Sequence, residues 1–478
     1  MDNSSKTKIV IFGAGKWGRI LAELYQKNGT DVDCFCDNNE ELWGVEIEGL
    51  RVVSPTELVY KKNEIRVIVI TKYMEEILEQ LKEMGLEDIV DKSYKHLWEA
   101  VWDIYSKENK ELIEIKDNKN NGFDKVFFLL SNGLAMGGVE TWSISEYKRL
   151  KEMGKEPVLI IESDKKNEID ASGLNKEYMP SRRKMSEAEH YMYMIDMLLR
   201  ELPCAVICNF GGEAAGPAFV AKRIAGESVR CIMVNHSDDS IYYETSCDAN
   251  EAIDYSVVIS SEMKKKMIAM GFPEGKLEEL IWVIPCKEEY DRKKRTSNNK
   301  IRIGFAGRIT VGAPKRTDLF PKLICMLNEY AIDYEFSIAG DGPYLDELKR
   351  EVELVDDNKR VVFLGRIEHN KIEEFWHNQD IMISLSDYEG HSISQCEAMA
   401  AGAVPVITDV SGARDDVCDG VNGYVVPVGS VEEMADRINR LNEDRDLLFQ
   451  MSRKAYELLR NRIDKGEMNA FWEGLLKK

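Results

Sequence analysis

Residues 381–409, IMISLSDYEGHSISQCEAMAAGAVPVITD, contain the pattern that decides the fold. The apolar run from Ile381 to Leu385 has the length of a buried parallel strand and is too short for a helix. A polar turn follows, and helix formers then run from Ser392, as N-cap, to a terminal Gly402. Val404 to Thr408 is typical of the next strand. The stretch therefore predicts a crevice beside a parallel sheet, where a helix N-terminus favours a phosphate group.

Two carboxylates flank this crevice, Glu389 in the turn and Glu397 eight residues later inside the helix. A chance pair of solvated glutamates is the plain alternative. The string E-GHSISQC-E-AMAAGAVPV resembles the signature of glycosyltransferase family 4, retaining enzymes with the two-lobed GT-B architecture. The resemblance implies that Glu389 lies beside the transferred sugar and that Glu397 holds the nucleotide ribose. It also implies donor contacts from Ser392 and Ile393 at the start of the helix.

Length and composition set the outer limits of the prediction. The chain has 478 residues, enough for about three domains of ~150 residues each. Hydrophobic residues make up 44% and charged residues 31%, as in globular proteins, and the formal net charge is −21. Such a charge argues against nucleic acid as a partner, because it offers no broad neutralisation of phosphates. An anionic donor must therefore meet locally clustered positive charge.

The cysteines and the apolar segments bear on the cellular compartment. The ten cysteines show no metal-ligand spacing and are typical of reduced thiols in the cytosol. No apolar run reaches the ~18 residues of a membrane span, and the N-terminus MDNSSKTK lacks an apolar core. We therefore expect a cytoplasmic protein. Peripheral association with the inner face of the membrane and a homo-oligomer both remain open.

Residues 1–105 predict a small Rossmann-like module. The apolar strand Lys8 to Phe12 runs directly into GAGKWG, which gives Gly13, Gly15 and Gly18 the spacing of a tight turn against a diphosphate. Asp37 follows 24 residues after Gly13, where a carboxylate accepts ribose hydroxyls.

We expect this first module to be too short for a full six-stranded dinucleotide domain. With WGVEIEGLRVVSP it resembles the nucleotide- or sugar-nucleotide-binding modules of polysaccharide-biosynthesis enzymes. The resemblance implies NAD or a sugar nucleotide as its ligand. The alternative is a module that only packs or dimerises.

A charged segment over residues 106–124 predicts a linker, and a first transferase lobe is expected over 125–295. Its opening strand KVFFLLS leads to Gly137 and Gly138, which resemble the Gly-Gly-x-Glu loop of family 4 and imply a substrate approach to the backbone. His236 follows the strand Arg230 to Asn235. The family resemblance makes it a candidate for orienting the donor sugar, and a structural histidine is the alternative.

The second lobe is expected over 296–478, with its last helix packing back across the first lobe. Its first strand, IRIGFAG, leads to Arg308 and then to Lys315 and Arg316. In family 4 a Gly-Arg and a later lysine neutralise the diphosphate. Arg308 fits the first role, and Lys315 the second with Arg316 as its rival. Ile367 lies where relatives hold the base with main-chain atoms.

These features predict an α/β protein with a small Rossmann-like domain at its start, and the resemblance implies a GT-B architecture of two Rossmann-like lobes after it. The resemblance implies a retaining glycosyltransferase that moves a sugar from a nucleoside diphosphate sugar to a glycan or lipid-linked acceptor, without a metal ion, in surface polysaccharide or glycan assembly. A glycoside phosphorylase of the same fold and a non-catalytic nucleotide-sugar sensor or scaffold remain as alternatives. The linker also leads us to expect that residues 125–478 fold and act without the first module.

Overall fold

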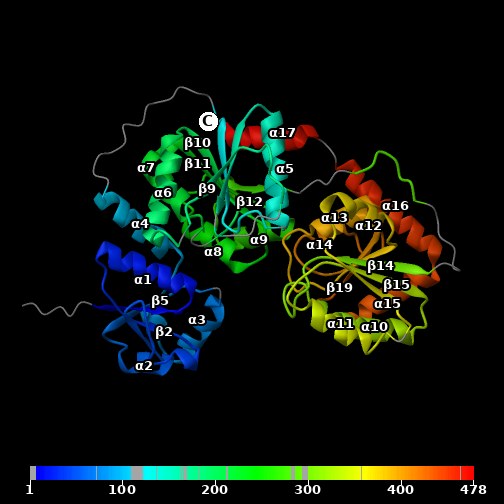
Figure 1. The fold of residues 1–478 in the computed structure, drawn as a ribbon, viewed down its shortest axis with the longest axis horizontal. Helices are drawn as coiled ribbons and strands as arrows, with labels where there is room; N and C mark the ends of the chain where they lie inside the picture. The colour runs from blue at the N-terminus through cyan, green and yellow to red at the C-terminus, as the bar shows by residue number, and fades with distance from the viewer. Residues whose placement is uncertain are drawn as a thin grey trace, which may run out of the picture.

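The chain forms three α/β units, each built on its own sheet (Figure 1). The computed structural model describes residues 7–108, 122–280, 286–292 and 300–477, apart from residues 72, 136, 163, 165–168, 182, 212–213, 357 and 463–464. Most of the predicted linker and the predicted boundary at 295 lie outside the described residues. No described helix combines the length and the apolar character needed to cross a bilayer.

The N-terminal module has a six-stranded sheet in the order β3-β4-β2-β1-β5-β6. Its strands are β1 (Lys8–Phe12), β2 (Val32–Cys36), β3 (Glu46–Ile47), β4 (Leu50–Val53), β5 (Ile65–Val69) and β6 (Val90–Lys92). Its helices are α1 (Lys16–Asn28), α2 (Pro55–Tyr60), α3 (Met74–Glu83) and α4 (Lys95–Glu108). The module is smaller than a full six-stranded dinucleotide domain: five of its strands are parallel, and the sixth, β3, is a two-residue strand that pairs antiparallel with β4.

The first lobe has a parallel seven-stranded sheet in the order β13-β12-β11-β10-β7-β8-β9. The strands are β7 (Lys125–Leu130), β8 (Glu156–Glu162), β9 (Lys176–Met179), β10 (Cys204–Cys208), β11 (Val229–Asn235), β12 (Tyr255–Val258) and β13 (Leu277–Glu279). The helices are α5 (Gly138–Glu152), α6 (Glu187–Arg200), α7 (Gly216–Ala225), α8 (Ser240–Asp248) and α9 (Ser261–Ala269). Nearly every central strand residue is buried, as expected of strands covered by helices on both faces.

The second lobe has a parallel six-stranded sheet in the order β16-β15-β14-β17-β18-β19. The strands are β14 (Ile301–Ala306), β15 (Tyr334–Ala339), β16 (Val361–Gly365), β17 (Ile381–Ser384), β18 (Val404–Thr408) and β19 (Tyr424–Val426). The helices are α10 (Phe320–Glu329), α11 (Leu345–Glu353), α12 (Ile372–His377), α13 (Ile393–Ala400), α14 (Ala413–Asp416), α15 (Val431–Glu443) and α16 (Arg445–Asn461). In chain order this is 3-2-1-4-5-6, so the crevice lies between the ends of β14 and β17.

One hydrophobic core runs without interruption from the N-terminal module into the first lobe. Helix α4 lies between the two units, and its Trp98 packs edge to face on Phe219 of α7 with ring centroids 5.1 Å apart. The Arg223 guanidinium lies 4.2 Å from the centre of the Trp102 ring, also in α4. This shared core argues against the expectation that residues 125–478 fold without the module.

Helix α17 (Lys465–Leu476) lies against the first lobe, beside α5, although α16 before it belongs to the second lobe (Figure 1). The Trp472 indole is buried there and its Nε1 donates a hydrogen bond of 2.6 Å to Glu146 of α5. The Arg230 guanidinium donates to the carbonyl of Leu475 at 3.0 Å. The last helix therefore ties the end of the chain to the first lobe.

Candidate active site

The site is built at the switch point of the second-lobe sheet. Arg308 follows β14 and Glu389 follows β17, and these two strands pair in parallel. Their carboxyl ends therefore meet at one edge of the sheet, which brings a cation and a carboxylate together although about 80 residues separate them in the chain. Ser394 of α13 donates to the carbonyl of Ala306 at 2.8 Å and fixes the helix beside the Arg308 loop.

Two glycines after β15 make room for the loop that carries Arg308. A Cβ on Gly340 would lie 1.9 Å from the carbonyl oxygen of Gly307, and Gly340 has a φ of +152°. A Cβ on Gly342 would lie 2.0 Å from the carbonyl oxygen of Ile309. Any side chain at either position would displace the backbone around Arg308. The glycines of the GDGPY loop thus serve to place the cationic loop.

Lys315 and Glu389 form an ion pair inside the site. Lys315 Nζ lies 2.5 Å from Glu389 Oε1, and both side chains are largely shielded, with 22% and 15% exposed. The same carboxylate oxygen accepts a hydrogen bond from Ser386 Oγ at 2.6 Å. The lysine is thus held at the turn that carries Glu389. A diphosphate entering the site would compete with that carboxylate for the ammonium group.

Arg316, the rival of Lys315, is engaged elsewhere. Its guanidinium pairs with Asp387 at 3.1 Å and with Asp318 at 3.3 Å. Two carboxylates therefore neutralise it before any ligand arrives. This geometry favours Lys315 over Arg316 as the second cation of the site.

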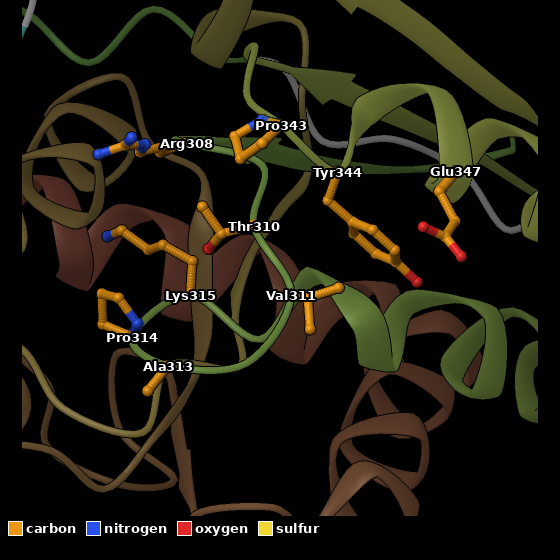
Figure 2. A pocket seen from close by; sticks show the side chains of 9 residues that line it. All are labelled: Arg308, Thr310, Val311, Ala313, Pro314, Lys315, Pro343, Tyr344 and Glu347. Carbon is orange, nitrogen blue, oxygen red and sulfur yellow. The ribbon is translucent and has the colours of Figure 1, made fainter. Parts of the chain in front are cut away.

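Arg308 and Lys315 line one wall of a cavity of about 620 Å³. Figure 2 shows both side chains extending to the same side of the loop, whereas the Tyr344 ring extends to the other side. Within the described part of the chain, the Arg308 guanidinium has no ion-pair or hydrogen-bond partner. The ion pair from Lys315 to Glu389 joins this cationic wall to the turn after β17.

Helix α13 begins and ends as its sequence predicts. Ser392 caps it by accepting a hydrogen bond from the backbone of Gln395, and Gly402 beyond its end has a φ of +76°. Glu397 lies on the second turn, half-buried, and burial raises the pKa of its carboxyl to about 7. The Trp376 indole acts in the opposite direction but more weakly. Glu397 is therefore a carboxyl poised to change its charge near neutral pH.

The glycine loop of the first lobe reaches this helix. Gly137 caps α5 and Gly138 begins it, and a Cβ on Gly138 would lie 2.9 Å from Cδ1 of Ile393. A Cβ on Gly137 would lie 2.6 Å from the Glu140 carboxylate, which is buried and whose pKa is raised by that burial. The structure thus brings Gly137, Gly138 and the start of α13 together across the two lobes.

His236 follows β11 and faces the turn of the second lobe. Its Nε2 lies 2.9 Å from Asn209 Oδ1, and its ring packs edge to face on Trp142 with centroids 4.8 Å apart. Asn209 Nδ2 donates to the carbonyl of Leu129, which makes Oδ1 the acceptor and places the hydrogen of His236 on Nε2. Burial lowers the pKa of His236 to about 3, so the ring is neutral at neutral pH.

His236 and Glu389 are neighbours through the main chain of Gly390. A Cβ on Gly390 would lie 2.5 Å from the carbonyl oxygen of His236. Only glycine therefore permits the turn after Glu389 to rest on the first lobe. Ile367, by contrast, packs its side chain among the apolar residues on one face of the second-lobe sheet. Its predicted main-chain contact with a base remains a prediction.

The fingerprint of the N-terminal module forms the tight turn that its spacing predicts. A Cβ on Gly18 would lie 1.8 Å from the carbonyl oxygen of Gly13, and Gly13 has a φ of +109°. Gly15 caps α1. Asp37 does not point freely into the crevice: one oxygen accepts from the backbone of Ala14 at 2.8 Å and the other from that of Asn39 at 2.9 Å. Its carboxylate is already used to hold the turn.

A buried polar cluster behind the active-site turn was missed at the sequence level. His391 Nε2 lies 3.0 Å from Cys396 Sγ and 3.3 Å from Asp416 Oδ2. Arg462 and Gln395 also bind the Asp416 carboxylate. A guanidinium on the carboxylate and burial that raises the pKa of the Cys396 thiol both oppose a metal ion there. No sequence spacing pointed to the cluster, because Asp416 and Arg462 come from different elements.

Comparison with known proteins agrees with this geometry. Residues 287–458 match the family described as Glycosyl transferases group 1, and residues 5–89 match the family described as C2185-like, N-terminal. The chain is 30% identical over 154 residues to the alpha-D-kanosaminyltransferase of Streptomyces kanamyceticus, covering 32% of this chain and 39% of the relative. It is 22% identical over 253 residues to the N-acetyl-alpha-D-glucosaminyl L-malate synthase of Bacillus anthracis, covering 50% and 65%. The chain thus spans less than two thirds of either relative.

Solved structures share the fold at low identity. Anabaena Alr3699/HepE in complex with UDP and glucose superposes with a TM-score of 0.60 at 17% identity, over 73% of this chain and 98% of that one. A mutant of S. aureus TarM, in complex with Fondaparinux, alpha-GlcNAc-glycerol and UDP, superposes with a TM-score of 0.53 at 15% identity, over 98% and 99%. These likenesses confirm the GT-B fold of the two lobes, and the match to the group 1 glycosyl transferases, over residues 287–458, takes in most of the second lobe.

Proposed function

We propose that the chain is a retaining glycosyltransferase that moves a sugar from a nucleoside diphosphate sugar to an acceptor in surface polysaccharide or glycan assembly. One observation carries the proposal. Arg308 and Lys315 line one wall at the switch point of the second lobe, Lys315 pairs with Glu389, and the next residue, Gly390, rests on the carbonyl of His236 of the first lobe. A guanidinium and an ammonium at this edge suit a diphosphate, and a carboxylate beside them suits the positive charge of a sugar that is leaving it.

In the proposed reaction the bond between the anomeric carbon and the diphosphate oxygen breaks while the acceptor hydroxyl bonds to the same face of the sugar. The departing phosphate oxygen takes the hydroxyl proton. Arg308 and Lys315 neutralise the charge that builds on the diphosphate, which is the work that a divalent cation does in other transferases. We therefore propose that transfer proceeds without a metal ion.

The carboxylates and the histidine have separate roles in this proposal. Glu389 lies at the sugar, where its charge favours an oxocarbenium-like transition state. Glu397 holds the ribose hydroxyls from the second turn of α13. His236 is neutral with its hydrogen directed at Asn209, so Nδ1 is left as the nitrogen that accepts a hydrogen bond from a sugar hydroxyl. Ser392, Ile393, Gly137 and Gly138 bring backbone N–H groups of two helix starts to the cleft.

The donor class and the acceptor class follow from chemistry and from the named relatives. Neighbouring structures hold UDP or UDP-glucose, and curated relatives are named as enzymes that transfer or join sugars. A nucleoside diphosphate sugar would place its two phosphates between Arg308 and Lys315. The acceptor is a glycan or a lipid-linked glycan that offers a hydroxyl at the first lobe.

For the N-terminal module we propose a nucleotide, either NAD or a sugar nucleotide, in the crevice between Gly13 and β5. The residues fit such a ligand, because the tight turn at Gly13 and Gly18 leaves the start of α1 free of side-chain caps. When the nucleotide binds, the Asp37 carboxylate would accept a hydrogen bond from a ribose hydroxyl. This bond would either replace the one from the Ala14 N–H or be made beside it. A thermal-shift series with NAD and with sugar nucleotides, on the whole chain and on Asp37→Ala, tests this assignment.

The central experiment measures sugar transfer and nucleotide binding together. Whole protein is screened against a panel of nucleoside diphosphate sugars, with and without excess EDTA, and calorimetry measures the affinity for the matching free diphosphate. Arg308→Ala should weaken that affinity by about 1.5 to 3 kcal/mol, because it removes a charge-assisted contact. Arg316→Gln, which removes an already paired cation from the same loop, is the control and should change the affinity little.

Other results would overturn parts of the proposal. An unchanged affinity for the diphosphate in Arg308→Ala would show that the diphosphate does not bind at this site. Activity that EDTA abolishes and Mg²⁺ or Mn²⁺ restores would end the metal-free mechanism. Release of a sugar 1-phosphate from an oligosaccharide would identify a phosphorylase, and binding without turnover would identify a sensor.

A further inference from the structure

A second set of contacts, none of which is assigned to the substrate above, joins the two lobes. It consists of four polar side chains, here named the latch. Asp238 and Ser261 belong to the first lobe, and Ser411 and Asp415 belong to the loop and short helix after β18 of the second lobe. None of the four carries a role in the reaction proposed above.

Asp415 binds the start of a helix on the opposite lobe. Its Oδ2 accepts the backbone N–H of Ser261 at 3.0 Å, and its Oδ1 accepts the Ser261 hydroxyl at 2.5 Å. Ser261 is the first residue of α9, whose own cap Ser260 already accepts from Met263. A carboxylate at a helix N-terminus gains from the dipole as well as from the hydrogen bonds. The second lobe thus completes the capping of a first-lobe helix.

Asp238 makes the reciprocal contact from the first lobe. Its Oδ2 accepts the Ser411 hydroxyl at 2.5 Å, and Lys266 of α9 and Tyr243 of α8 bind the same carboxylate. Only 9% of the Asp238 side chain is exposed, so a lost partner would leave a shielded charge less well compensated. The two halves of the latch therefore share α9, with Lys266 on one half and Ser261 on the other.

The latch lies directly behind the turn that carries Glu389. A Cβ on Gly412, between Ser411 and Asp415, would lie 2.4 Å from the carbonyl oxygen of Gly390. Gly390 rests in turn on the carbonyl of His236, where its own Cβ would lie 2.5 Å away. The turn is therefore clamped between the latch loop and the first lobe. Asp416, next to Asp415, anchors the loop from behind through Arg462.

We propose that Asp415 and Ser411, with Asp238 and Ser261, are positioning residues that hold the lobes together and thereby aim Glu389 at the sugar. The part concerning Glu389 rests on the proposed function. An error of about an ångström in the position of a reacting group costs roughly 100-fold in rate, so a loosened turn is felt in turnover more than in binding.

Hydrogen exchange on the whole protein tests the latch without any substrate. In Asp415→Ala, peptides covering residues 259–264 and 387–391 should exchange faster, because Ser261 loses its acceptor and the turn held by the Asp387 bond to Pro314 loosens. Peptides covering β10 should be unchanged. Asp409→Ala is the matched control: it removes a carboxylate from the same loop, but one that pairs with Arg414 within the second lobe.

Kinetics on the same variants test the positioning role. Asp415→Ala should lower kcat roughly 10-fold to 100-fold with a nearly unchanged donor KM, and Ser411→Ala and Ser261→Ala should do so more weakly. Asp415→Glu, which keeps the carboxylate, should recover part of the loss. Asp409→Ala should keep both constants.

Each outcome decides the proposal. Unchanged exchange at 259–264 in Asp415→Ala overturns the latch, and faster exchange there with normal kcat reduces it to a structural contact. Faster exchange at 259–264 without any change at 387–391 breaks the link to Glu389. If the wild-type chain transfers no sugar from any donor, the proposed function fails while the exchange data still decide the latch.

Discussion

Two joints, the interfaces between neighbouring units, connect the three units of this chain. The contacts at these two joints differ in polarity. The joint between the N-terminal module and the first lobe is mainly apolar: one core continues through it and one face of α4 is buried in it, while Asp248 of α8 accepts hydrogen bonds from Ser93 and Tyr94. The joint between the two lobes is polar and close-fitting, with hydrogen bonds between side chains and glycines in contact with backbone carbonyls. Opening an apolar joint exposes hydrophobic surface to water at a high cost in free energy, whereas such hydrogen bonds exchange readily with water.

The difference shows which units can move against each other. Separating the module from the first lobe would expose Trp98, Phe219 and their neighbours to water. Separating the lobes would expose mainly groups that water can satisfy. We therefore expect the module and the first lobe to behave as one body, and the second lobe to move against them more readily.

The strongest test of this comparison is deletion of residues 1–124. The remaining chain would present the apolar faces of α6 and α7 that now pack on α1 and α4. We expect it to aggregate or to lose cooperative unfolding of the first lobe, measured by calorimetry and light scattering. A soluble and active fragment would show that the shared core is dispensable.

A single substitution probes the same joint. Trp98→Ala should lower the free energy of unfolding by about 3 to 5 kcal/mol, because a buried ring leaves a cavity against Phe219. Denaturant titration measures the effect. Trp43→Ala, at a tryptophan 39% exposed on the same module, is the matched control and should cost far less.

At the polar joint the large effect should be kinetic. Glu389→Gln should lower kcat by ~10²-fold or more, the scale of removing one positioned electrostatic group. The affinity for the free nucleoside diphosphate should change little, because Glu389 is assigned to the sugar. Steady-state rates and calorimetry on this variant separate the two quantities, and a near-normal kcat would refute the assignment of Glu389.

The smallest expected effect is at the apolar joint and is a dependence of stability on pH. Burial raises the pKa of Glu244 in α8 from 4.5 to about 7, and one of its carboxylate oxygens is buried without a hydrogen-bond partner among the described residues. The Glu244 carboxyl binds its proton more tightly in the folded chain than in the unfolded chain. The protonated carboxyl therefore makes its full contribution to the free energy of unfolding below pH 4.5, and this contribution is lost as the pH rises through about 7.

Glu244→Gln should therefore raise the free energy of unfolding at pH 8 relative to the wild type by about 1 to 2 kcal/mol, a value reduced for partial solvent screening. At pH 4 the two proteins should unfold alike. Denaturant titrations at both pH values check the sign. A variant that is less stable than the wild type at pH 8 would mean that the carboxylate is ionised and needed at the joint.

Long apolar runs bounded by glycines made most of the fold predictable from sequence. The expected strands at Lys8 to Phe12 and at Val404 to Thr408 have the bounds that the structure gives. The cap at Ser392 and the close approach at Gly18 also follow from local chemistry. Short edge strands such as β3, β9, β13 and β19 were not predicted, because two to four residues carry no periodic pattern.

Contacts between elements distant in the chain could not be predicted in the same way. Sequence spacing left Lys315 and Arg316 as rivals, and only the position of Asp387 and Asp318 separates them. Nothing local to Asp415 indicates a helix start on another lobe. The polar composition of residues 106–124 also gives no information about the helix faces of the module and the first lobe that pack together.

The return of α17 to the first lobe has a mechanical consequence. The second lobe is an insertion in the first, entered after β13 and left after α16, so two separate crossings of the chain tether it. One tether would permit a free swivel. Two tethers remove most sliding and twisting and leave rotation about the line that joins them as the easy motion. We therefore expect the two lobes to open and close mainly by rotation about one axis.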